Sequence, residues 1–136
     1  MKRILGIDFG LVRTGLAISD ELQLLAHPLE TVPANTKRTE RIAEIVREKN
    51  VELVVVGIPN RMSGETGPAA EKALAFAKEL RAVLGCGVVT WDERLTTVAA
   101  HRALRDAGKK TRETRAYVDQ VAAQMILQGY LDSRRQ

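Results

Sequence analysis

The sequence predicts an α/β protein built on a mixed five-stranded sheet, with helices on both faces. Three segments with strand character follow one another at the start of the chain, joined by short links. Such links favour antiparallel neighbours. Helix and strand patterns then alternate, which is typical of parallel strands joined by helical crossovers. The 136 residues suffice for one core, so we expect a single domain over residues 1–136.

The first three strands are expected over residues 2–8, 14–19 and 24–32, with a turn at residues 10–13 between the first two. The first two segments are mostly apolar, and the first contains an aspartate. Pro28 interrupts the third segment. Because proline has no amide hydrogen to donate to a neighbouring strand, this strand is placed at an edge of the sheet.

The middle of the chain predicts a helix, a strand and a second helix. Residues 37–49 show the 3.6-residue spacing of an amphipathic helix. The continuous apolar run at residues 51–58 is typical of a strand buried on both faces, usually a parallel one. A loop rich in glycine and polar residues follows at residues 57–67. Pro68 suits the first turn of the next helix, which should continue to residue 84.

A fifth strand is predicted over residues 88–91, followed by two helices. The first of these is capped by a threonine at position 96 or 97 and ends at residue 107. The last is expected over residues 113–131, after a basic link. With right-handed crossovers, the first, fourth and fifth strands lie side by side and parallel.

The composition excludes several classes of protein. Hydrophobic residues make up 45% of the chain, which indicates a globular protein, whereas 4% aromatic residues are too few for broad base-stacking platforms. The start of the chain shows no signal-peptide pattern, and no apolar run approaches membrane-spanning length. We therefore expect a cytoplasmic protein. Cys86 is the single cysteine, so an internal disulfide is excluded.

Asp8 stands inside the first strand, between two apolar residues. Aspartate is depleted in strands, and burying an ionised carboxylate without a partner is costly. A structural aspartate that bonds to the nearby turn is the alternative. The cost nevertheless favours a functional side chain, most often one that holds a cation.

Two further carboxylates are placed where the sheet could bring them to Asp8. Glu93 follows the fifth strand, and ligands of open α/β sheets bind at the carboxyl ends of parallel strands. A charge favoured by a helix dipole explains Glu93 equally well. Asp119 shares a helix face with two alanines and an isoleucine, so it should pack toward the sheet. For Asp119 taken alone, a solvent-facing position at the margin of this face is the commoner outcome.

Together, the three acids predict a metal site. Carboxylates in one pocket repel one another, and divalent cations remove that repulsion. Oxygen-only ligands select a hard ion, Mg²⁺ or Mn²⁺. Two such ions about 4 Å apart can clamp a phosphodiester. In this prediction Asp8 bridges both ions, and Glu93 and Asp119 each complete the shell of one.

Four sequence landmarks occur in order along the chain. The first is LGIDFG at residues 5–10, with RTG at 13–15 and SD at 19–20. The second is VGIP at 56–59, with Gly64 and Gly67, and the third is DERLTT at 92–97. The fourth is VD at 118–119, followed by AA at 122–123, IL at 126–127 and YL at 130–131. At these spacings the whole chain resembles the YqgF/RuvX family, a bacterial branch of the RNase H-like nucleases related to Holliday junction resolvases.

The resemblance implies an RNase H-like fold and a metal-dependent endonuclease, with Asp8, Glu93 and Asp119 as catalytic acids. Family members are linked to maturation of the 5′ end of 16S rRNA, which implies RNA and ribosomal precursor particles as partners. Many are also described as Holliday junction resolvases, which implies branched DNA. By analogy with the family, the product end is a 5′-phosphate.

Several cations are candidates for phosphate contacts. Arg13 could reach a phosphate beside Asp8, or simply neutralise Asp8 or Asp20. The loop at residues 60–67, which carries Arg61, could close over a strand or be an ordinary surface loop. The net charge of +4 suits a polyanionic partner, but a solvated charged surface explains the basic residues before the last helix equally well. The candidates there are Lys109, Lys110, Arg112 and Arg115.

The sequence leaves three functions open. Within the nuclease prediction, RNA processing is favoured over junction resolution, because two symmetric cuts need a twofold dimer and no apolar helix demands one. We expect a monomer or a weak homodimer. A non-catalytic nucleic-acid-binding factor is the second possibility. The third, a phosphotransferase related to actin and the sugar kinases, conflicts with the short chain and with the lack of a Walker motif.

Overall fold

The computed structural model describes residues 2–95 and 112–135. Its elements follow the predicted order. They are β1 (Arg3–Asp8), β2 (Arg13–Ser19), β3 (Ala26–Pro33), α1 (Arg38–Glu48), β4 (Val51–Ile58), α2 (Pro68–Val83), β5 (Gly87–Asp92), the short 3-10 helix η1 (Glu93–Leu95) and α4 (Arg112–Ser133). The helix predicted to end at residue 107, together with Lys109 and Lys110, lies outside the described residues.

The five strands form one sheet in the order β3-β2-β1-β4-β5. The pairs β1–β2 and β2–β3 are antiparallel, whereas β1–β4 and β4–β5 are parallel. This arrangement confirms the predicted mixed sheet, with the first, fourth and fifth strands side by side. It also confirms β3 as an edge strand. The register of β3 against β2 shifts beside Pro28, where the ladder lacks a donor.

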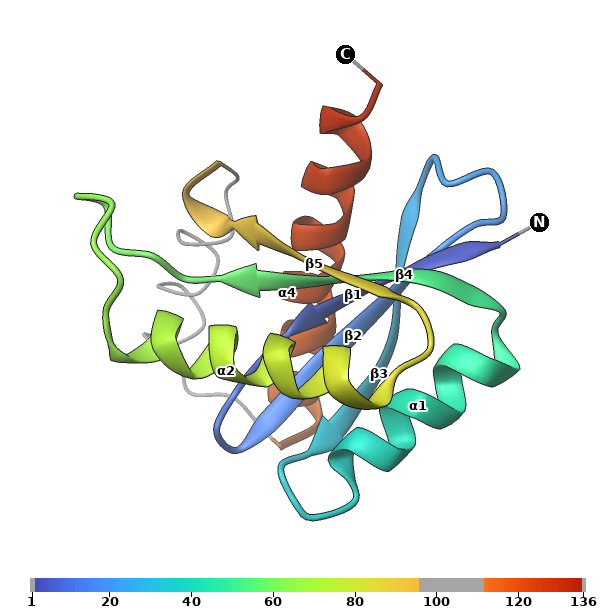
Figure 1. Cartoon of the computed structure of the whole chain (residues 1–136), viewed down its shortest axis with the longest axis horizontal. Coiled ribbons are helices and arrows are strands. Elements are labelled where there is room, and N and C mark those ends of the chain that lie inside the picture. Colours follow the sequence, from blue (N-terminus) through green and yellow to red (C-terminus); the bar gives the residue numbers. More distant parts are fainter. Residues whose placement is uncertain (1, 96–111, 136) are drawn as a thin grey trace.

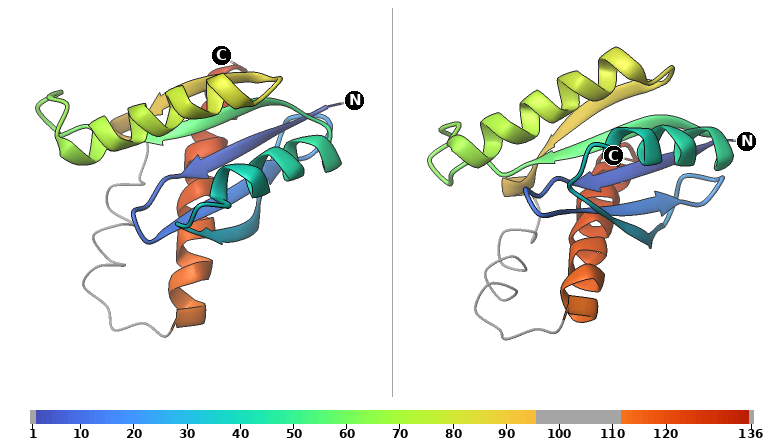
Figure 2. Two further views of the ribbon diagram at one scale, coloured as in Figure 1. Left: turned by 60° about the horizontal axis from the view of Figure 1, so that its bottom comes forward. Right: turned by 90° about the horizontal axis from the view of Figure 1, so that it is seen from below.

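Helices cover both faces of the sheet, as predicted. α1 and α2 lie on one face, and α4 runs across the strands on the other (Figure 1). The two rotated views separate these three layers (Figure 2). The strands of the centre of the sheet are therefore buried from both sides, which explains the continuous apolar run of β4.

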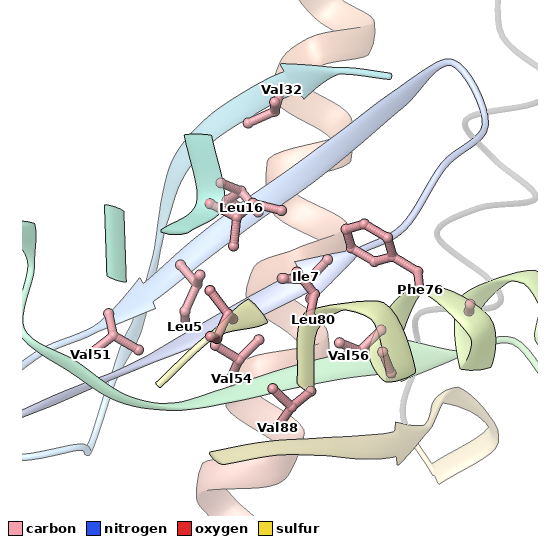
Figure 3. Close-up of a cluster of buried hydrophobic side chains, with 14 of the residues drawn as sticks. Leu5, Ile7, Leu16, Val32, Val51, Val54, Val56, Phe76, Leu80 and Val88 are labelled. Atoms are coloured by element: carbon pink, nitrogen blue, oxygen red, sulfur yellow. The ribbon is translucent and has the colours of Figure 1, made fainter. Parts of the chain in front are cut away.

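Side chains alternate between two cores along each strand. Leu5 and Ile7 belong to the core under α1 and α2, whereas Ile4 belongs to the core under α4. In β4, Val54 and Val56 face α1 and α2, and Val55 faces α4. Figure 3 shows the first of these cores, which is filled by large branched and aromatic side chains.

α4 is attached to the edge strand β3 by a row of glutamines one helical turn apart. Gln128 accepts a hydrogen bond from the Ala26 amide at 2.9 Å, and Gln124 donates one to the Ala26 carbonyl at 2.9 Å. Gln120 donates to the Thr31 hydroxyl at 3.1 Å. These bonds fix the position of α4 along the sheet. Within the described part of the chain, no helix is long and apolar enough to cross a membrane.

Candidate active site

The three predicted acids are buried. The exposed fraction is 3% for Asp8, 2% for Glu93 and 4% for Asp119. They are the only acidic side chains buried among residues 2–95 and 114–135. Because burying a carboxylate is costly, three such residues in a small domain call for a specific role.

Asp8 ends the central strand and points toward α4. Its neighbour Ile7 belongs to the core under α1 and α2, and successive side chains of a strand face opposite sides. In the sheet, Asp8 pairs with Gly15 of β2. On its other side, Ile7 pairs with Val56 of β4, which places Gly57 next to Asp8. Asp8 is thus flanked by a glycine on each neighbouring strand.

Gly15 makes room for Asp119. A Cβ atom on Gly15 would lie 2.1 Å from the Asp119 carbonyl oxygen and 3.0 Å from the Asp119 Cβ. No side chain can be accommodated at such distances, so the backbone of α4 lies directly on β2 at this point. The consequence is that Asp119 sits over the strand position that pairs with Asp8.

Gly57 makes room for Glu93 in the same way. A Cβ atom on Gly57 would lie 2.8 Å from Glu93 Oε2 and 2.4 Å from the Ile126 Cδ1 atom of α4. Glu93 begins η1, directly after β5, and its carboxylate turns back over β4. All three acids therefore lie on the α4 face, near the carboxyl ends of β1, β4 and β5. Asp119 packs against the sheet as predicted.

The two glycines are site residues that sequence reasoning missed. Both belonged to the family landmarks, but neither was given a role. An isolated glycine within a strand indicates a close approach of another backbone or group. That signal was present at Gly15, which lies inside the second strand, and at Gly57, near the end of the fourth.

Arg13 contacts Asp119, an acid that the sequence did not single out as its partner. Arg13 Nε donates a hydrogen bond to Asp119 Oδ2 at 2.5 Å. Asp20 instead accepts hydrogen bonds from the amides of Leu25 and Leu24 at 3.1 and 2.8 Å. These backbone bonds lower the pKa of Asp20 below its ordinary value.

The neighbouring carboxylate of Asp92 serves a different purpose. Asp92 forms hydrogen bonds with the Arg94 guanidinium, at 2.6 Å to Nη2, and these bonds lower the pKa of Asp92. Of these two adjacent acids, Glu93 is the one that lies against Gly57.

The other basic candidates are more dispersed. Arg61 is exposed in the loop after β4, where its Nη1 lies 3.7 Å from Glu65 Oε2 of the same loop. Arg115 is exposed on the first turns of α4, and Arg112 is the first residue of that helix. Their part in binding phosphates stays a prediction.

The donor set suits a hard divalent cation. It offers only carboxylate oxygens, and the two glycines leave space for two of those carboxylates on either side of Asp8. No three Asp, Glu, His or Cys side chains of the described residues are already arranged around one point as metal ligands. One of the three acids, Asp119, is bonded to Arg13 in this conformation.

Comparison with known proteins adds a family and a fold. The sequence model of the family described as "RuvX: Holliday junction resolvase" matches residues 2–133. Proteins from Bacillus cytotoxicus and from Bacillus cereus strain G9842 are each 44% identical over 97% of this chain and 99% of their own length. Both carry the provisional name pre-16S rRNA nuclease.

Two solved structures share the architecture. RuvC of Thermus thermophilus, in complex with a Holliday junction substrate, matches with a TM-score of 0.57 at 19% identity, over 99% of this chain and 96% of that one. The fowlpox virus resolvase, in complex with Holliday junction DNA, matches with a TM-score of 0.54 at 12% identity, over 98% and 99%. These similarities confirm the RNase H-like fold.

Proposed function

Because this chain belongs to the RuvX family, we propose that it is a divalent-metal-dependent nuclease that processes the 5′ end of pre-16S rRNA. One observation carries the proposal. Three buried carboxylates lie on one face of the sheet, and two glycines on the strands beside Asp8 give the other two acids their places. The fold and the family agree with a nuclease of this kind.

In this proposal Asp8, Glu93 and Asp119 would hold Mg²⁺ or Mn²⁺, and Asp8 lies between the other two acids. Bound ions of this type supply an activated water and stabilise the departing oxygen of a phosphodiester. The protein carries the three carboxylates on packed elements of the fold. Asp8 is on the central strand, and Asp119 is on a helix held by the glutamine row.

Basic side chains around the site would bind the substrate backbone. Arg13 lies next to Asp119 and is partly exposed. Arg61 and Arg115 are exposed. Such contacts to phosphates are independent of sequence and weaken with salt. RNA specificity would then come from the shape of the precursor end or from the ribosomal particle that presents it.

Resolution of Holliday junctions is the second candidate. It is favoured by the description of the family and by the similarity to two resolvases solved with junction DNA. The two relatives at 44% identity favour RNA. Junction resolution also needs two active sites related by a twofold axis, and hence a dimer.

The test is cleavage of an end-labelled RNA that carries the 16S precursor 5′ end, beside a synthetic four-way DNA junction. Each substrate is incubated with Mg²⁺, Mn²⁺ or EDTA. Wild type is compared with Asp8→Asn and with Asp132→Asn, an exposed acid paired with Arg135 at the far end of α4. We expect metal-dependent cleavage of the RNA that Asp8→Asn abolishes and Asp132→Asn retains.

Cleavage of the junction alone would replace RNA processing with resolution. If neither substrate is cut while wild type and Asp8→Asn bind RNA equally well, the protein is a non-catalytic binding factor. Cleavage that persists in EDTA, or in Asp8→Asn, contradicts the proposed metal site.

A further inference from the structure

The ion pair between Arg13 and Asp119 links the start of β2 to one of the three acids. Arg13 Nε donates to Asp119 Oδ2 at 2.5 Å, and the side chains are 29% and 5% exposed. Charge-assisted hydrogen bonds are among the stronger ones in proteins. Arg13 thus supplies positive charge to a carboxylate that is almost fully buried.

The backbone of Arg13 is fixed while its side chain reaches the surface. Arg13 pairs with Pro33 of β3, and the adjacent Val12 carbonyl accepts a hydrogen bond from the Ala34 amide at 3.0 Å. A Cβ atom on Gly10 would lie 2.1 Å from the Arg13 carbonyl oxygen, so the turn is tightly closed. The guanidinium can therefore change partners by rotation of its side chain, without movement of the strand.

A divalent cation on Asp119 would stand close to the Arg13 guanidinium. Like charges a few ångströms apart repel, and the repulsion is strongest where water is scarce. The carboxylate would then no longer need the arginine as its counter-charge. The partly exposed side chain has a route outward, to the turn where Val12 is exposed.

We propose that Arg13 is the counter-ion of Asp119 in the cation-free protein and leaves it when a divalent cation binds. The guanidinium is then available to a phosphate of the nucleic acid. This inference rests on the proposed function and deepens it. On this inference, cation binding releases Arg13 from Asp119 and lets it contact the substrate.

The sign of the effect on cation binding tests this inference. Mn²⁺ binding is measured by calorimetry without nucleic acid, for wild type, Arg13→Gln, Arg13→Lys and Asp119→Asn. Because the cation no longer competes with a charged hydrogen bond, Arg13→Gln should bind Mn²⁺ about tenfold more tightly. Arg13→Lys, which keeps the charge, should lie between Arg13→Gln and wild type. Asp119→Asn should lose binding.

Thermal unfolding provides a second readout. Arg13→Gln should unfold at a lower temperature than wild type in EDTA, and saturating Mn²⁺ should remove most of that difference. Arg41→Gln is the matched control, because Arg41 pairs with Glu30 at 2.7 Å on the α1 side of the molecule. It should leave the Mn²⁺ affinity unchanged, and its own deficit should be the same with and without Mn²⁺.

Cleavage kinetics test the second half of the inference. At saturating Mn²⁺, Arg13→Gln should raise the KM for the precursor RNA by about tenfold, the loss expected for one charged hydrogen bond to a phosphate. The kcat should change much less.

The outcomes separate this inference from the proposed function. Weaker Mn²⁺ binding by Arg13→Gln would make Arg13 an orienting partner of Asp119, and unchanged binding would mean that the pair persists beside the cation. Either result overturns the inference while the metal site stands. If wild type binds no Mn²⁺, or Asp119→Asn binds it equally well, the metal site fails and the inference fails with it.

Discussion

The two faces of the sheet are packed with different kinds of side chain. Under α1 and α2 the core consists mainly of leucine, isoleucine, valine and phenylalanine, and large side chains separate the helices from the strands. Under α4 the core mixes alanines with larger side chains, and glycines of β1 and β2 lie against the helix backbone, so the helix approaches the strands closely. The buried acids lie on this second face. One face is therefore packed for stability, whereas the other brings buried polar groups together.

The largest expected effect is a loss of cleavage rate, caused by a substitution on the α4 face. Glu93→Gln removes one carboxylate charge beside Gly57 without changing the side-chain volume. Cleavage of the precursor RNA should fall by about 1,000-fold, as for other residues that act as a unit. Asp92→Asn is the control, because Asp92 pairs with Arg94. A single-turnover assay measures both. Equal losses would mean that the charge of this segment, rather than Glu93 itself, matters.

The close approach of α4 can be broken at Gly15. Because an added Cβ would meet the Asp119 carbonyl oxygen at 2.1 Å, Gly15→Ala forces the helix away from the strand. We expect a loss of about 3 kcal/mol in the free energy of unfolding and loss of cleavage. Gly85→Ala is the control, since an added Cβ there has no atom within 4 Å. Urea unfolding of both variants provides the measurement, and equal stabilities would refute the close contact.

A substitution in the core under α1 and α2 should lower the stability of the protein but leave its cleavage activity unchanged. Leu80 of α2 is fully buried under the sheet, and Leu80→Ala should cost about 3 kcal/mol through lost packing and the cavity left behind. Cleavage per folded molecule should stay at the wild-type level, because none of the three buried acids lies on this face. A rate that falls more than the folded fraction would show that the two faces are not independent.

The smallest expected effect concerns pH. Hydrogen bonds from Arg41 hold the pKa of Glu30 below its ordinary value of 4.5. The folded state therefore gains stability from this pair above pH 4.5, and loses it as the pH falls below that value. Glu30→Gln should cost at most about 1 kcal/mol at pH 7, because the pair is partly exposed and solvent screens it. At pH 2 it should cost less. Unfolding midpoints at the two pH values measure the difference.

Local patterns were enough to predict the order of the strands, the edge position of β3 and the burial of Asp8. Each depends on neighbours in sequence: an apolar run, a proline in a ladder, a charge inside a strand. The functions of Gly15 and Gly57 depend on a helix that follows much later in the chain. The partner of Arg13 lies 106 positions away. Such contacts depend on the position of α4 on the sheet. No local pattern of residues specifies that position.

The row of glutamines on α4 has a consequence for how copies of the protein meet. An edge strand offers unpaired amides and carbonyls to any other strand, which is a common route to aggregation. At Ala26 both backbone groups of β3 are bonded to glutamine side chains of α4. The start of this edge is thus capped by a helix of the same chain, and Pro28 removes a further donor. The helix that carries Asp119 thus also hinders pairing of β3 with the edge strand of another copy of the protein.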